Sequence, residues 1–182
     1  MILFALLACA PDDATDTSPL DTSADADTDT DTDTDADADS DSDADTDLGV
    51  QSIVGNWVSA GADLAPLLAG DPFNYAAIHA SFNADSSYTV TATDQDGQTG
   101  TLQGTFSTST ATLPGTITLT QSAPYTATAD GIWQVAGSTL TYEVVQVDPD
   151  YGFTAPTPAG GFGSTQGDGL AAGDNVQVYR AE

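Results

Sequence analysis

The sequence has 182 residues and a very acidic composition, with 28 Asp and Glu residues, one Arg, no Lys and a net charge of −27. Nucleic-acid binding requires Lys and Arg to displace the counterions of the phosphate backbone, so this composition excludes DNA and RNA as partners. Docking on anionic lipid by charge is excluded for the same reason. Cations, basic surfaces and neutral ligands remain compatible with it. Such acidity is also typical of proteins from salty environments.

The first eight residues are small and apolar and lead directly into Cys9, the single cysteine, so no intrachain disulfide is possible. This run is too short to span a bilayer, which takes about 20 residues. Leu6-Leu7-Ala8-Cys9 resembles the lipobox of bacterial lipoproteins. The resemblance implies that residues 1–8 are a signal peptide and that Cys9 becomes acylated. Several acyl chains on Cys9 would together hold the protein on a membrane.

This resemblance places the protein in the cell envelope, anchored in the membrane through lipid on Cys9. In the sorting of bacterial lipoproteins, an Asp after the cysteine favours the inner membrane. Ala10 stands at that position here, so the resemblance implies the outer membrane or the cell surface. The alternative is an ordinary apolar N-terminus that happens to contain a cysteine.

Residues 9–48 carry the anchor cysteine and a segment very rich in Asp and Thr. From Asp25 to Asp47 every second residue is Asp, alternating with Thr, Ala and Ser. This alternation has no apolar face to bury, and its like charges repel, so we predict a disordered, extended tether. Calcium binding is an alternative, because carboxylates are calcium ligands. The segment lacks the glycine turn and the bidentate Glu of a calcium loop, so diffuse counterions are the expectation.

From residue 49 to residue 182 apolar residues alternate with Thr, Ser and Gln, and turn residues separate the alternating runs. This pattern predicts an all-β, antiparallel domain of eight or nine short strands. The strands are expected at 53–59, 77–83, 87–93, 99–108, 115–121, 125–129, 131–135, 139–147 and 175–180. In the second of them Ile78, Ala80 and Phe82 share one face. A short helix is expected at 62–69, limited by Pro66.

Gly55-Asn56-Trp57 resembles the G-x-W signature of lipocalin-like domains, and Gly131-Ile132-Trp133 resembles their late hairpin. The resemblance implies an up-and-down barrel of about eight strands whose base is closed by Gly55, Trp57 and Arg180. It further implies a cation–π contact in which Arg180 packs over Trp57. The middle motif of true lipocalins is absent, so the domain is described as lipocalin-like.

The sequence offers little chemistry for catalysis. His79 is the single histidine, and it lies on the face opposite Ile78, where we expect no chemistry. Asp94, Asp96 and Gly97 are interpreted as a hairpin turn, because a calcium loop would need further acids at fixed spacing. No nucleophile motif is present. We therefore predict no catalytic residues, no metal site, no cofactor and no enzyme activity.

Residues 148–174 form a long segment without strand or helix pattern, and such segments are usually functional or disordered. It contains three aromatic residues, Tyr151, Phe153 and Phe162, which we take as a candidate ligand or contact loop. The alternative is that these rings pack the loop onto its own domain.

The resulting expectation is a monomeric, envelope-anchored lipoprotein whose barrel binds a small apolar or amphipathic ligand. The alternative is a non-catalytic domain for surface display or adhesion, acting on a surface partner through the 148–174 loop. The volume of the barrel interior distinguishes the two, because ligand binding requires an apolar cavity and display requires only a filled core.

Overall fold

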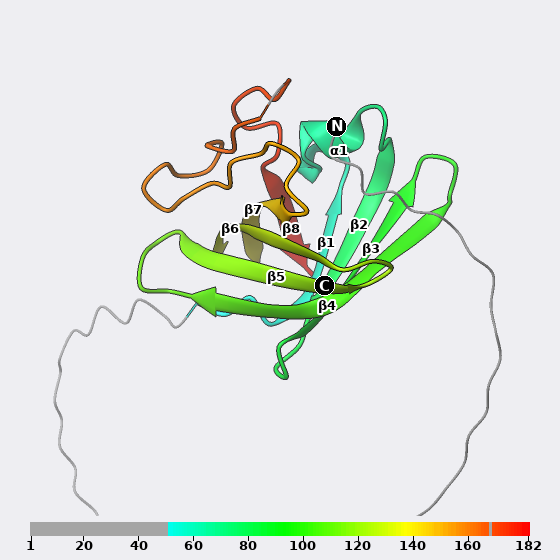
Figure 1. The fold of residues 1–182 in the computed structure, drawn as a ribbon. Helices are drawn as coiled ribbons and strands as arrows, with labels where there is room; N and C mark the ends of the chain where they lie inside the picture. The colour runs from blue at the N-terminus through cyan, green and yellow to red at the C-terminus, as the bar shows by residue number, and fades with distance from the viewer. Residues whose placement is uncertain (1–50, 168) are drawn as a thin grey trace, which may run out of the picture. The chain divides into compact units, whose positions relative to one another are not determined.

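A computed structural model describes residues 51–167 and 169–182. In these residues eight antiparallel strands follow one another around a closed barrel in sequence order (Figure 1). The predicted fold class, an all-β up-and-down barrel, is thus confirmed. The predicted signal peptide, the acylation of Cys9 and the acidic tether concern residues that lie outside the described part.

The strands correspond to those expected from the alternation, with small shifts at their ends. They are β1 (Gly55–Ala60), β2 (Tyr75–Phe82), β3 (Ser87–Asp94), β4 (Thr99–Ser109), β5 (Gly115–Ala123), β6 (Ala127–Ala136), β7 (Thr139–Asp148) and β8 (Gln177–Ala181). Each strand pairs with the next, and β1 pairs with β8 to close the sheet.

The inner and outer faces follow the period of two that a one-sided sheet requires. Ile78, Ala80 and Phe82 of β2 are buried, as predicted, and His79 between them is exposed. The outer faces of β3, β4 and β5 carry mostly Thr and Ser. The sheet therefore has an apolar inside and a hydroxyl-rich outside.

Two of the expected elements differ in the structure. The expected strands 125–129 and 131–135 are parts of one continuous strand, β6, because Asp130 and Gly131 also pair with β7. Gly131 allows the two strands to approach closely, since a Cβ there would overlap the main-chain oxygen of Glu143 on β7. The helix at 62–69 is two short pieces, the 3-10 turn η1 (Gly61–Asp63) and the helix α1 (Pro66–Ala69). Pro66 begins α1, since proline is favourable at the first helical position.

The two ends of the barrel are built differently. At one end, called here the Trp57 end, Trp57, Phe82 and Trp133 fill the interior, and Phe82 meets Phe106 edge-on with ring centres 5.2 Å apart. At the other end, called here the α1 end, lie η1, α1, the β3–β4 and β5–β6 turns and the segment 149–176 (Figure 1). None of the helices in the described residues has the length and apolar character needed to cross a membrane.

Candidate functional site

Trp57 closes the base of the barrel from the inside. Its side chain is 5% exposed, and the indole N–H donates a hydrogen bond of 2.8 Å to the carbonyl of Ile53. Gly55 has a φ of +153°, a conformation that favours glycine, and the indole ring lies beside it. The short Gly55-Asn56-Trp57 motif is thus a local plug that joins the start of β1 to the core.

Arg180 is not part of this plug, which corrects the expected cation–π contact. It pairs with Val58 in the β1–β8 ladder, one position away from Trp57, so its side chain lies on the opposite face of the sheet. Its guanidinium donates to both carboxylate oxygens of Asp63, at 3.0 and 2.9 Å, and to Thr139 at 3.0 Å. The hydrogen bond from Arg180 lowers the pKa of Asp63.

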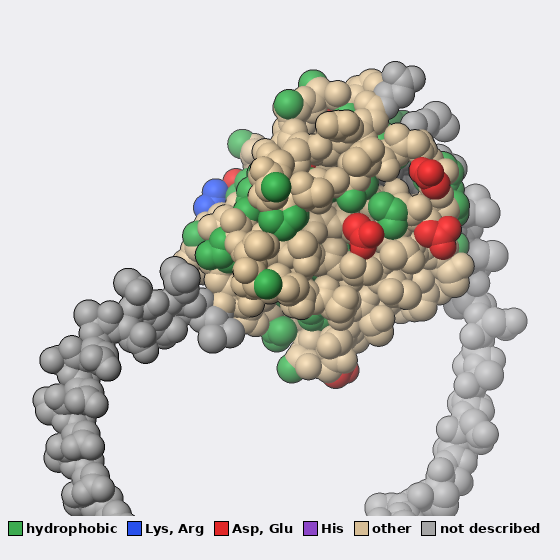
Figure 2. Space-filling model, turned by 60° about the vertical axis from the view of Figure 1, so that its left-hand side comes forward, with side chains coloured by type: hydrophobic (Ala, Val, Ile, Leu, Met, Phe, Trp, Pro, Cys, Tyr) green, Lys and Arg blue, Asp and Glu red, His purple; other side chains and the backbone are tan. Residues whose placement is uncertain are grey.

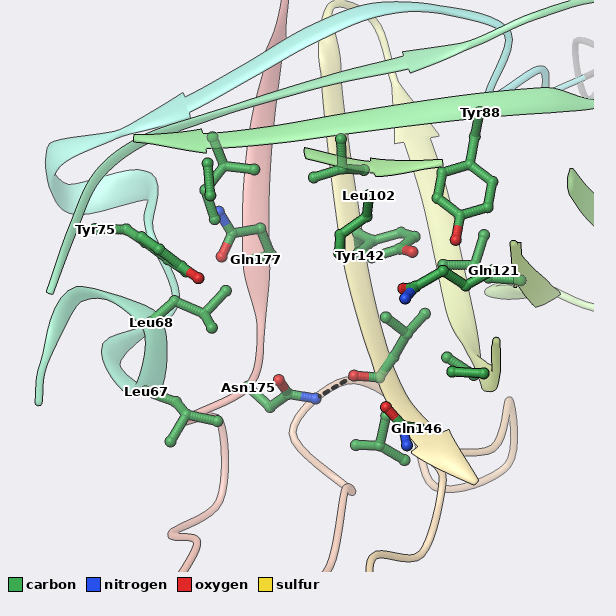
Figure 3. A pocket seen from close by; sticks show the side chains of 18 of the residues that line it. Leu67, Leu68, Tyr75, Tyr88, Leu102, Gln121, Tyr142, Gln146, Asn175 and Gln177 are labelled. Atoms are coloured by element: carbon green, nitrogen blue, oxygen red, sulfur yellow. Dashed lines mark hydrogen bonds between the residues drawn. The ribbon is translucent and has the colours of Figure 1, made fainter. Parts of the chain in front are cut away.

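An apolar cavity lies inside the barrel at the α1 end and has a volume of about 120 Å³ (Figure 3). Its walls combine side chains from the strands with Leu67 and Leu68 of α1. The apolar part of the lining also includes Ile78, Val90, Ala92, Leu102, Leu119 and Ala129. Small residues such as Ala92 and Ala129 leave the space that larger side chains fill at the Trp57 end.

Two buried tyrosines turn their hydroxyl groups into this cavity. Tyr88 is 3% exposed and Tyr142 is 8% exposed, and neither hydroxyl is hydrogen bonded to another described residue. Among the described residues no fully buried side-chain nitrogen or oxygen lacks a partner, so both hydroxyls must border the free space of the cavity. Figure 3 shows them pointing toward the same region, near the amide of Gln121. They are therefore available to hydrogen bond with a ligand.

Amide side chains supply the remaining polar lining. Gln121 donates to the carbonyl of Tyr125 at 2.9 Å, and Gln146 donates to the carbonyl of Pro149 at 3.2 Å. No charged side chain lines this cavity among the described residues. Gln121 and Gln177 occupy inward positions where the alternation otherwise places apolar residues. These two positions could have indicated a polar lining from the sequence, but they were not recognised.

Gln177 of β8 holds the start of α1 at the α1 end of the barrel, which is here called its mouth. Its side-chain oxygen accepts from the main-chain N–H of Ala65 at 2.8 Å, and its nitrogen donates to Ser59 at 2.6 Å. The main-chain N–H of Leu67 also donates to the carbonyl of Asp174 at 3.0 Å. These bonds fix Leu67 and its neighbour Leu68 in the cavity wall.

The buried phenols make the stability of the barrel sensitive to alkaline pH. Burial raises the pKa of Tyr88 to about 12, with a smaller contribution from the nearby Tyr125 phenol, and burial also raises the pKa of Tyr142 and of Tyr179.

An unfolded phenol loses its proton near pH 10, whereas the folded Tyr88 retains it until about pH 12. Its contribution to stability is therefore complete below pH 10 and is lost as the pH rises through 12, at about 1.4 kcal/mol per unit of pKa difference. Urea unfolding at about pH 9 and about pH 11 should show this fall, with a smaller slope in Tyr88→Phe. Equal unfolding free energies at the two pH values would contradict the assignment.

The 148–174 loop is pinned to the outer face of β7 by a buried carboxylate. Glu143 is 1% exposed and accepts hydrogen bonds from the main-chain N–H groups of Gly163, at 2.6 Å, and of Thr165, at 2.9 Å. It also accepts from the hydroxyl of Thr165. The role of Glu143 was not predicted from the sequence. The feature that could have indicated it is a single acidic residue inside a strand rich in Val.

The three loop aromatics are not equally accessible. Tyr151 is 48% exposed, but Phe153 and Phe162 are only partly exposed. The ring of Phe153 lies directly against Gly167 within the same loop. The loop thus presents the side chain of Tyr151 to solvent and uses that of Phe153 for its own packing.

The remaining sequence candidates lie on the outer surface. His79 is within 3.0 Å of the Glu182 carboxylate on the exposed face of the sheet. Asp94 accepts from the main-chain N–H groups of Asp96 and Gln98, and Gly97 has a φ of +81°, so the expected hairpin turn is confirmed. In the described ranges no three His, Cys, Asp or Glu side chains are grouped so as to hold a metal ion.

Comparison with known proteins gives no match: no family model fits the sequence, and no curated protein or solved structure is found to be similar to it.

Proposed function

We propose that this chain is a cell-envelope lipoprotein, anchored through Cys9, whose barrel domain binds a small apolar or amphipathic ligand in the cavity at the α1 end. The observation that carries the proposal is the pair of tyrosine hydroxyls, of Tyr88 and Tyr142, which border an apolar cavity and have no hydrogen-bond partner among the described residues. A buried hydroxyl without a hydrogen bond costs about 1–3 kcal/mol. A ligand with a group that donates to these hydroxyls or accepts from them would remove this cost.

The size of the cavity sets the size of the ligand. An apolar cavity of about 150 Å³ in another protein is large enough to bind benzene. The cavity described here, at about 120 Å³, suits one small ring or a short alkyl chain, with the rest of the ligand extending through the mouth.

The lipid anchor is supported by Leu6-Leu7-Ala8-Cys9, the run that resembles a lipobox. Contact through the 148–174 loop is the less favoured function, because Phe153 packs against Gly167 of the same loop and Phe162 is only partly exposed. The cavity, in contrast, combines apolar walls with unused hydrogen-bonding groups, which is the usual composition of a small-molecule site.

Filling the cavity should abolish binding. Ala129 lies in the cavity wall on β6, and Ala129→Leu adds a branched side chain to that space. We expect the affinity for 2-phenylethanol, measured by NMR titration of the tyrosine ring signals, to fall at least about tenfold, which corresponds to about 1.4 kcal/mol. Ala136→Leu is the matched control, because Ala136 lies on the same strand but is exposed. Equal affinities in the two variants would refute the site.

Tyr88→Phe provides an independent test that preserves the packing. Because the Tyr88 hydroxyl has no partner among the described residues, its removal should leave the unfolding free energy unchanged or slightly raised. The affinity for 2-phenylethanol should nevertheless fall severalfold, while the affinity for toluene, which has no hydrogen-bonding group, should not. A parallel loss for both compounds would contradict the proposed role of the hydroxyl.

A further inference from the structure

The carboxylates of the barrel domain are distributed unequally between its two ends. The strand ends and connections at the α1 end carry six of them, Asp71, Asp94, Asp96, Asp148, Asp150 and Asp174. At the Trp57 end the described residues include Asp85 and Glu182, and Glu182 lies beside His79. The end that contains the cavity is therefore the strongly acidic one.

The single basic side chain does not offset this charge. Arg180 is on the outer face of β8, and both oxygens of the Asp63 carboxylate already hold its guanidinium. Figure 2 shows most of the visible acidic side chains gathered on one side of the domain among hydrophobic ones, with the basic side chain at the opposite edge.

Asp94 connects this acidic rim to the cavity. It pairs with Tyr75 in the β2–β3 ladder, and Tyr75 lines the cavity wall. Burial raises the pKa of the Tyr75 phenol, and the nearby Tyr125 and the negative charge of Asp94 raise it further. The field of Asp94 thus extends to groups that a bound ligand would touch.

An acidic rim alone does not make a binding site, but it decides the charge of a ligand that the cavity accepts. The independent sign of a ligand is the pair Tyr88 and Tyr142, two side chains more than nine-tenths buried whose hydroxyls face the cavity with no partner among the residues that the structure describes. A carboxylate ligand would meet no positive charge at this end and several negative ones. An ammonium group at the mouth would be attracted at a distance of a few ångströms while still hydrated.

We infer that the barrel selects cationic amphiphiles, small amines whose apolar ring or chain enters the cavity while the ammonium group stays at the acidic mouth. This inference rests on the proposed function and adds the ligand's charge to it. It predicts a fixed order of affinity for ligands of equal size: the ammonium compound binds most tightly, the alcohol less tightly, and the carboxylate least.

The test uses 2-phenylethylammonium, 2-phenylethanol and phenylacetate with the full-length chain carrying Cys9→Ser, so that no acyl chain of the protein itself competes for the cavity. At low salt the ammonium compound should bind at least about tenfold more tightly than phenylacetate, and the difference should shrink as salt screens the rim charges. Equal affinities, or a preference for phenylacetate, would overturn the inference while leaving the cavity site in place. Absence of binding by all three compounds would instead refute the proposed function.

A pair of charge variants locates the effect. Asp94→Asn removes one rim charge and keeps a side-chain oxygen that accepts from Asp96 and Gln98, so the turn is preserved. It should weaken 2-phenylethylammonium binding severalfold and leave 2-phenylethanol binding unchanged. Asp85→Asn removes the same charge from the Trp57 end and should change neither affinity. Equal effects of the two variants would show that net charge, and not the rim, determines the preference.

Discussion

Trp57→Ala should lower the free energy of unfolding by about 3–5 kcal/mol, the range found for large aromatic side chains removed from a core. The indole is 5% exposed and belongs to the hydrophobic core at the base of the barrel, so its removal leaves a cavity among buried side chains. The substitution also leaves the carbonyl of Ile53 without its hydrogen-bond donor. Urea denaturation followed by the fluorescence of the remaining Trp133 measures the loss directly.

Two further variants separate the parts of this effect. Trp57→Phe keeps most of the ring but loses the N–H, so we expect a smaller loss, of about 1–2 kcal/mol. Val58→Ala changes the neighbouring side chain on the outer face and should cost less than either. A loss below about 1 kcal/mol in Trp57→Ala would mean that the indole does not close the barrel base.

Glu143→Ala should destabilise the protein by about 2–4 kcal/mol, because it leaves the donors of Gly163 and Thr165 without their carboxylate acceptor in a buried position. The loss should be concentrated in the 148–174 loop. Amide hydrogen exchange at Gly163 and Thr165 should accelerate at least about tenfold. The amides between β2 and β3 should accelerate only as much as the loss of global stability requires.

Two controls define the role of the buried carboxylate. Glu143→Gln retains one acceptor oxygen but turns an NH₂ group toward a main-chain donor, so an intermediate loss is expected. Glu182→Ala removes an exposed carboxylate and should stay within about 0.5 kcal/mol of the parent protein. If loop amides exchange at the same rate in Glu143→Ala and in the parent protein, Glu143 does not pin the loop.

The alternation of apolar and polar residues was sufficient to predict the strands and their faces. In a barrel each strand has one buried face, so a shift of one residue would expose the whole apolar set. That constraint leaves its mark in local sequence, as in Ile78, Ala80 and Phe82. The strand break expected between 129 and 131 is wrong, because Asp130 and Gly131 both pair with β7, and local sequence does not identify that partner strand.

The site was less accessible to sequence reasoning, because it depends on contacts between residues far apart in the chain. The role of Glu143 depends on a loop that returns to it some 20 residues later. The position of Arg180 depends on the register between the first and last strands, which no local pattern specifies. The cavity depends on the summed volumes of side chains from most of the strands and from α1.

Native mass spectrometry can show whether the space at the α1 end of the barrel is a ligand site. The full-length Cys9→Ser chain, incubated with 2-phenylethylammonium, should retain one bound molecule per chain. The same adduct should persist when Ala136→Leu is added and should disappear when Ala129→Leu is added. An adduct of equal abundance in the Ala129→Leu protein, or none in any of the three, would contradict the account.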